Sequence, residues 1–236
     1  MPSSARRSSR RSWWPAGNVY TAVKCSVEVP HAQAECQTAP GTGRDLVWSL
    51  EVGAQVSDAC MNTKTSYGAP FVSAIKGDGS FDAVTPGGQT VVVTGGNFGP
   101  AWLGTLDNVT YGPTGSEFVT SPRCVITDNH TTITCKTVEG GGAKLKWVVN
   151  VDNQASTQPT TFYALPNISS IGGPGAKDAL STGGQRLVLD GFNFANDALL
   201  DSVTYGWTGV EYACADPKLE EDHTRIACDT AAGWGK

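Results

Sequence analysis

The sequence lacks three features that would each point to a class of protein. No apolar run approaches the roughly 20 residues that a membrane-spanning helix needs. No set of apolar residues recurs at helical spacing over a useful length, which argues against a helical fold. Lys and Arg are not in excess, because the formal net charge is -5. That mild acidity argues against nucleic acid as a partner, since phosphates call for clustered basic side chains.

Patterns typical of catalytic and cofactor sites are also missing. The glycine clusters lack the Gly-Lys-Ser/Thr ending of a phosphate-binding loop. Asp and Glu residues form no pairs at repeated positions, and no Ser, Cys or Thr has a plausible base nearby in sequence. We therefore expect no enzyme activity, no cofactor and no metal.

What the sequence does contain is a repeated cysteine segment, clearest at Cys124–Cys135. Because strand side chains alternate between faces, this segment reads as a β-hairpin whose two cysteines face each other. Such cysteines lie at about the 5.5 Å Cα separation of a disulfide. The pairs expected in this hairpin are Cys124 with Cys135, Ile126 with Ile133, and Thr127 with Thr132, around a turn at 128–131.

The same segment occurs twice more in the chain. Cys25 and Cys36 have the same spacing, and the loop between Cys214 and Cys228 is three residues longer. Repeated facing pairs predict three disulfides and an oxidising compartment, and each bridge would contribute on the order of 3 kcal/mol. The alternative is reduced cysteine packed as a small apolar residue. Cys60 is left over, in the stretch 58–66 that is the least regular between the repeats.

The repeats divide the chain into four segments. Residues 1–18 carry Arg6, Arg7, Arg10 and Arg11 without the apolar core of a secretory signal, and are expected to be a disordered basic tail. Residues 19–68 correspond to the second half of a unit, because Leu46 to Ser57 align with Leu145 to Ser156. Residues 69–165 form a complete unit, and 166–236 form one that stops before the counterpart of Leu145. Glycine-rich turns and Thr/Val-rich runs predict an all-β sandwich class for these units.

The order of these signals resembles the IPT/TIG domain, the immunoglobulin-like fold of plexins, related receptors, fibrocystin-type proteins and Rel-type transcription factors. The residues that carry the resemblance are Pro70, Ile75, Gly87-Gly-Gln89, Val91 to Gly99, Val109-Thr-Tyr-Gly112 and the Cys124/Cys135 pair. The resemblance implies tandem immunoglobulin-like β-sandwiches of the early-set type, one complete and two partial. It covers nearly all of the chain outside the basic tail.

Several side chains invite a functional reading. His31, His130 and His223 each precede the second cysteine of a pair by five residues, which is too far for a shared metal, and we expect solvated turn histidines. Trp48 and Trp147 each fall in a strand with alternating apolar residues, and both are expected to pack inside their sandwiches.

Sequons at Asn108, Asn129 and Asn167 predict N-glycosylation, best placed at Asn129 in a turn.

The leading hypothesis is a non-enzymatic module of a larger extracellular or cell-surface protein, acting in recognition, adhesion or receptor signalling. Its partner would be a protein or a glycan, and a membrane would be reached only through parts outside this chain. The alternative is a carbohydrate-binding accessory module, with Trp102, Trp207 and Trp234 as loop candidates. A DNA-binding use of the fold, as in Rel-type factors, is opposed by the acidity and the paired cysteines, so no nucleic acid is expected.

Overall fold

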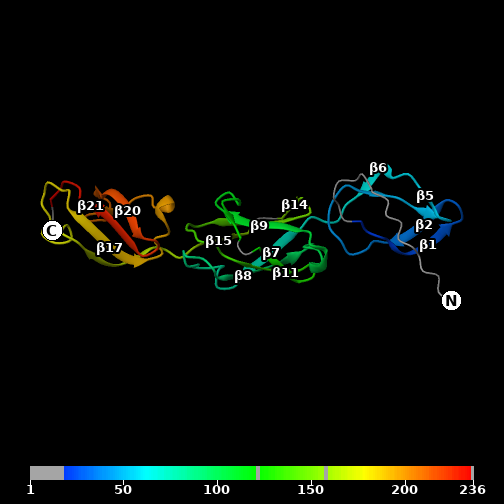
Figure 1. The fold of residues 1–236 in the computed structure, drawn as a ribbon, viewed down its shortest axis with the longest axis horizontal. Coiled ribbons are helices and arrows are strands. Elements are labelled where there is room, and N and C mark those ends of the chain that lie inside the picture. The colour runs from blue at the N-terminus through cyan, green and yellow to red at the C-terminus, as the bar shows by residue number, and fades with distance from the viewer. Residues whose placement is uncertain (1–18, 121–122, 157–158, 235–236) are drawn as a thin grey trace. The chain divides into compact units, whose positions relative to one another are not determined.

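The computed structural model describes residues 19–120, 123–156 and 159–234, which form an all-β protein (Figure 1). The predicted basic tail, 1–18, lies outside the described residues. The chain divides into two compact units, Met1–Gly41 and Thr42–Lys236. None of the described helices is long and apolar enough to cross a membrane.

Residues 71–161 form a sandwich of two antiparallel sheets. One sheet has the order β11-β12-β8-β7, and the other has the order β10-β9-β13-β14 with β15 also paired to β13. Figure 1 shows β9 and β14 in one layer and β7, β8 and β11 in the other. The strands are β7 (Phe71–Lys76), β8 (Thr90–Gly96), β9 (Leu106–Gly112), β10 (Phe118–Val119), β11 (Val125–Asp128), β12 (Thr132–Lys136), β13 (Leu145–Val151), β14 (Gln154–Ala155) and β15 (Thr160–Thr161).

Alternation along the strands builds the core of this middle sandwich. In β13 the side chains of Trp147, Val149 and Val151 are buried, while the residues between them are partly exposed. Trp147 stacks on Tyr111 of β9, with ring centroids 4.4 Å apart and planes 6° from parallel. A cluster of aliphatic and aromatic side chains from both sheets surrounds this pair, so the sandwich has its own hydrophobic core.

A glycine turn leads into β8 where the chain approaches another loop closely. Gly87 has φ +77°, and a Cβ there would lie 2.4 Å from the carbonyl carbon of Val138. Its neighbour Gly88 donates its N–H to the Thr137 carbonyl. Gly183 repeats this arrangement against Ala231. Both the positive φ and the close contact exclude a side chain, which explains the repeated Gly-Gly-Gln.

The hairpin β11–β12 has the predicted facing pair Ile126 and Ile133, but its last pair is different. Asp128, and not Thr127, lies opposite Thr132, because a β-bulge interrupts the register between Ile126 and Asp128. The extra residue shortens the turn to 129–131, where His130 has φ +68°.

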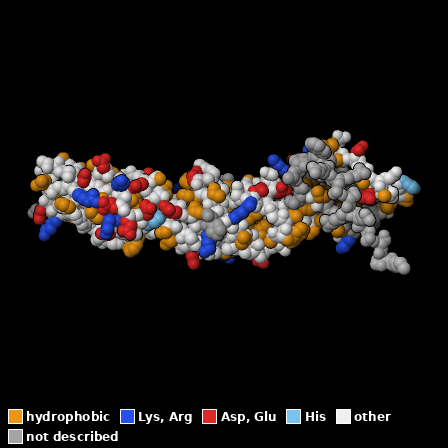
Figure 2. Space-filling model, in the orientation of Figure 1, with side chains coloured by type: hydrophobic (Ala, Val, Ile, Leu, Met, Phe, Trp, Pro, Cys, Tyr) orange, Lys and Arg blue, Asp and Glu red, His pale blue; other side chains and the backbone are white. Residues whose placement is uncertain are grey.

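Residues 167–229 form a second, less complete sandwich. Its larger sheet has the order β16-β17-β21-β20, and the strands β18 and β19 pair separately. The bounds are β16 (Asn167–Gly172), β17 (Arg186–Phe192), β18 (Thr204–Tyr205), β19 (Tyr212–Ala213), β20 (Ala215–Glu221) and β21 (Arg225–Asp229). Charged side chains gather over this C-terminal sandwich in Figure 2. Two ion pairs lie in it, Arg186 with Glu220 and Arg225 with Asp190.

The N-terminal strands form three small sheets. β1 (Val23–Val29) pairs with β2 (Gln33–Gln37), β3 (Leu46–Trp48) with β6 (Cys60–Thr65), and β4 (Glu51–Val52) with β5 (Gln55–Val56). The stretch expected to be irregular is therefore mostly strand β6, which places Cys60 opposite Trp48. The domain boundaries at 68/69 and 165/166 stay predictions.

Candidate binding surface

The three disulfides lie at the hairpins that the cysteine spacing indicates. They join Cys25 to Cys36, Cys124 to Cys135 and Cys214 to Cys228. Cys60 is an exposed free thiol. Cys124, Cys135, Cys214 and Cys228 are buried within their sandwiches, so those bridges belong to the cores and not to a reactive surface.

The histidines differ from one another in their surroundings. His31 is exposed and His130 is half-buried, both with left-handed backbone. The prediction of a solvated histidine is wrong for His223, whose side chain is only 15% exposed. Its Nδ1 lies 2.8 Å from Thr85 Oγ1, and its Nε2 lies 3.8 Å from Glu139 Oε1. Among the described residues, no group of three or more His, Cys, Asp and Glu could hold a metal ion.

Two short turns are closed by a carboxylate, a feature that sequence reasoning missed. Glu117 accepts hydrogen bonds from Thr114 Oγ1 at 2.5 Å and from the backbone N–H groups of Thr114, Gly115 and Ser116. The hydrogen bond from the Thr114 hydroxyl is the main cause that lowers the pKa of Glu117 to about 2, and backbone N–H groups that include those of Ser116 and Thr114 lower it further.

The second carboxylate turn belongs to the C-terminal sandwich. Glu211 accepts from Thr208 Oγ1 at 2.5 Å, and this bond is the main cause that lowers its pKa to about 2. The repeated Thr-Gly-x-Glu sequence, at Thr114 and Thr208, was the signal that could have revealed both turns.

Two buried tyrosines, Tyr111 of β9 and Tyr163 near the end of the middle sandwich, bond to Val138 in the loop after the β11–β12 hairpin. The hydroxyls of Tyr111 and Tyr163 are 2.6 Å apart, and Tyr163 donates to the Val138 carbonyl at 2.7 Å. Burial raises the pKa of both phenols. They therefore stay neutral at physiological pH and act in packing, not as acids or bases.

Among the residues that the structure describes, the three predicted loop tryptophans have the most exposed aromatic side chains. Trp102 lies in the 3-10 helix η1 (Ala101–Leu103) and is 73% exposed. Trp207 lies in the carboxylate turn between β18 and β19 and is 92% exposed, and Trp234 follows β21 and is 88% exposed. The Tyr212 hydroxyl donates to the Trp234 carbonyl, so the last two tryptophans belong to the same sandwich.

The predicted glycosylation sites are all on the surface. Asn108 lies in β9 and accepts a hydrogen bond from Asn150, while Asn129 accepts one from the Ala101 N–H. Asn167 opens β16 and is exposed. Glycosylation at these three residues stays a prediction.

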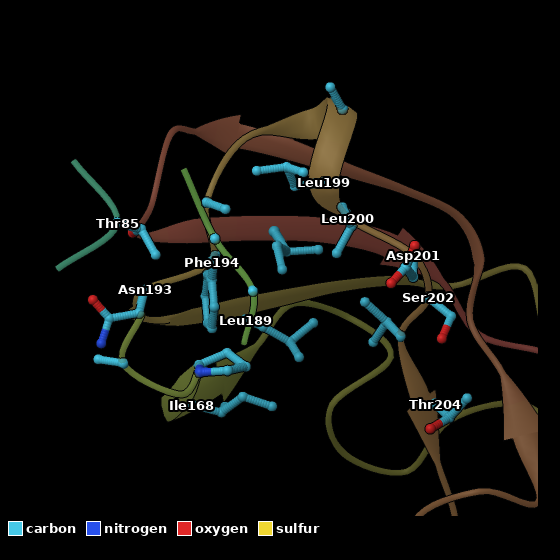
Figure 3. Close-up of a pocket in the computed structure, with 18 of the residues that line it drawn as sticks. Thr85, Ile168, Leu189, Asn193, Phe194, Leu199, Leu200, Asp201, Ser202 and Thr204 are labelled. Carbon is cyan, nitrogen blue, oxygen red and sulfur yellow. The ribbon is translucent and has the colours of Figure 1, made fainter. Parts of the chain in front are cut away.

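A hollow of about 670 Å³ opens beside the C-terminal sandwich. Figure 3 shows Leu189, Phe194 and Leu200 among the side chains around it. Val203 and Ile226 also line it, and Gly141 and Gly142 of the middle sandwich border it. Most of these apolar side chains belong to the core cluster of the C-terminal sandwich, so the hollow lies against that core.

An unpaired strand edge borders the same hollow. In the middle sandwich β9 lies between β10 and β13. Its counterpart β18 pairs with β19 on one side. Along its other side no strand runs among the residues 159–234 that the structure describes.

A family model matches the middle sandwich. Residues 79–164 match the family model of the IPT/TIG domain. Similar solved structures include SGBP-B from a complex xyloglucan utilization locus in Bacteroides uniformis, with 16% identity over 71% of this chain and 44% of that one, and a TM-score of 0.33. They also include the full extracellular region of plexin A4, with 17% identity over 89% of this chain and 18% of that one, and a TM-score of 0.32. The chain thus spans less than half the length of either structure, and no curated protein sequence matches it.

Proposed function

We propose that this chain, which contains an IPT/TIG domain at residues 79–164, is a non-enzymatic recognition module that works outside the reducing cytosol. The disulfides and the immunoglobulin-like sandwiches support an extracellular or cell-surface location, because such bridges persist in oxidising compartments. Adhesion and receptor signalling are the roles that this architecture fits.

The exposed tryptophans Trp207 and Trp234 carry the proposal. Indole rings supply large contact areas and are enriched at the energetic centres of protein interfaces. Single exposed apolar residues are common, but two tryptophans about nine-tenths exposed in one sandwich are costly to leave in water. We therefore assign the loops of the C-terminal sandwich as the surface that contacts a partner protein.

Binding of the fluorescently labelled chain to cells of its own organism tests this assignment. Trp207→Ala and Trp234→Ala should each weaken binding by about tenfold, the scale of an interface anchor. Val119→Ala, which changes an exposed side chain of β10, serves as the matched control. Protease treatment of the cells should abolish binding. Binding that survives both tryptophan substitutions would overturn the assignment.

A glycan is the second candidate partner, favoured by the same two rings. Sugar rings stack on exposed aromatic faces, so a polysaccharide ligand would also need Trp207 and Trp234. Affinity electrophoresis in gels containing soluble polysaccharides should then retard the wild-type chain and not the double tryptophan variant. If no polysaccharide retards the chain, or if both forms are retarded equally, the glycan hypothesis fails.

A further inference from the structure

The outer face of the larger sheet in the C-terminal sandwich carries an exposed aromatic side chain. In β17 the side chains of Leu187 and Leu189 are buried, whereas Phe192 is 62% exposed. Because side chains alternate along a strand, Phe192 points away from the core that the two leucines enter. Its phenyl ring therefore stands on the outer surface of the sheet.

A glycosylation sequon lies directly opposite this ring. Asn167 of β16 pairs with Phe192 across the antiparallel strands, so the two side chains project from the same face. The Cβ atoms of such a pair lie about 4.5–5.5 Å apart. Asn167, Ile168 and Ser169 form the sequon, and all three residues are exposed. Ile168 lines the hollow on the inner side of the sheet (Figure 3), which agrees with Asn167 pointing outward.

The equivalent pair in the middle sandwich holds its aromatic ring differently. There Phe71 lies opposite Gly96, and a Cβ on Gly96 would be 2.5 Å from the Phe71 ring. The ring of Phe71 thus lies over the glycine backbone, a contact that a larger residue at position 96 would prevent. In the C-terminal sandwich Phe192 faces an asparagine instead of a glycine, and it is more exposed than Phe71, at 62% against 47%.

We propose that Asn167 carries an N-linked glycan whose first sugar stacks on the ring of Phe192. Side chains directly opposite each other on a sheet are in contact range, so a sugar on the Asn167 amide begins beside the ring. The C–H face of a sugar packs on an aromatic face and would cover apolar surface that water now contacts. The proposal rests on the extracellular location proposed above, because such glycans are attached in the secretory pathway.

Polar groups next to the ring suit the hydroxyls of a sugar. Asp190 lies two residues before Phe192 on the same face of β17. Its Oδ1 accepts a hydrogen bond from Arg225 Nε at 2.7 Å, and its Oδ2 accepts one from Ser170 Oγ at 3.3 Å. A sugar has apolar C–H faces and a polar rim, so this surface offers a partner to each part. Single exposed apolar residues are common. The proposal is therefore carried by the place of the ring opposite the sequon and not by its exposure alone.

Occupancy of Asn167 is tested on the full chain secreted from eukaryotic cells behind a heterologous leader peptide. Enzymatic release of N-glycans in ¹⁸O-labelled water should leave the mass of one labelled deamidation at Asn167, and Asn167→Gln should lose that signal. A chain secreted with its three disulfides but with a bare Asn167 would overturn the proposal. That outcome is distinct from failure of the proposed binding role, which the tryptophan variants test separately.

Stacking on Phe192 is tested by the ring current of the phenyl group. Glycans are trimmed to one ¹³C-labelled N-acetylglucosamine, and Asn167→Gln identifies the signals of the sugar at this site. In the folded chain these proton signals should lie upfield of their position in the denatured chain. Phe192→Leu keeps an apolar side chain and should remove the shift. Phe71→Leu, the matched change in the middle sandwich, should leave it unchanged. An occupied site whose sugar signals do not move on folding would overturn the stacking.

Discussion

At the scale of single residues, the carboxylate turns show how one side chain can accept the backbone hydrogen bonds that a neighbouring strand would otherwise accept. Residues 113–117 make a tight turn whose amides point inward, and Glu117 satisfies three of them while also accepting the Thr114 hydroxyl. Unpaired backbone N–H groups are costly, so the carboxylate fixes the turn only in its charged form.

The pKa of Glu117 makes this turn sensitive to acid. Because the pKa falls from 4.5 to about 2 on folding, the contribution of this group to stability is fully present above about pH 4.5 and is lost as the pH falls toward 2. The difference in melting temperature between wild type and Glu117→Gln should therefore shrink as the pH is lowered from 5 to 2.5. Thr114→Val, which removes the main hydrogen bond, should also reduce the melting-temperature difference that Glu117→Gln makes. Thr127→Val on the exposed hairpin should leave that difference unchanged. A difference independent of pH would contradict the assignment.

At the scale of elements, the disulfide hairpin is the unit that recurs. The bridge between Cys124 and Cys135 ties β12 to the residue just before β11, and its Cα atoms are 4.4 Å apart. Both sulfurs are buried, so the bridge is also part of the core beside Ile133.

Removing that bridge should destabilise the middle sandwich. A disulfide that closes a loop of this length raises the free energy of the unfolded chain by about 3 kcal/mol. The Cys124→Ala, Cys135→Ala double variant should therefore lose about that much free energy of unfolding in a urea titration. The Cys60→Ser variant is the control and should behave as wild type, because its thiol is exposed and free. Alkylation of the unreduced chain should modify one cysteine, and alkylation after reduction should modify seven. Six additional reactive thiols in the unreduced folded chain would contradict the extracellular assignment.

Sequence alone could predict the strands and their faces because alternation and cysteine spacing are local patterns. It placed Ile126 opposite Ile133 correctly but missed the bulge that brings Asp128 opposite Thr132. An inserted residue changes no composition, so the pattern does not reveal it. The surroundings of His223 also escaped prediction, since Thr85 lies 138 residues away in sequence and only the fold brings them together.

At the scale of the whole molecule, completeness differs between the sandwiches. The middle one has two sheets of four and five strands around a large core, whereas the described part of the C-terminal one has sheets of four and two strands around a smaller core. Buried apolar area is the main source of stability, so the middle sandwich should unfold last.

Limited proteolysis should expose that difference. We expect early cleavage within 19–68 and 166–236 and a resistant fragment close to the predicted unit 69–165, identified by mass. Single substitution of Val119, an exposed residue of β10, should leave the pattern unchanged. If the protease instead spares either flank and digests the middle, the predicted boundaries are wrong.

The buried tyrosine pair has a consequence for the behaviour of the chain in strong base. Because burial raises the pKa of Tyr111 and of Tyr163, exposed phenols ionise first as the pH rises. The phenolate absorbance of these two rings should therefore emerge as a late, separate step that coincides with loss of the middle sandwich.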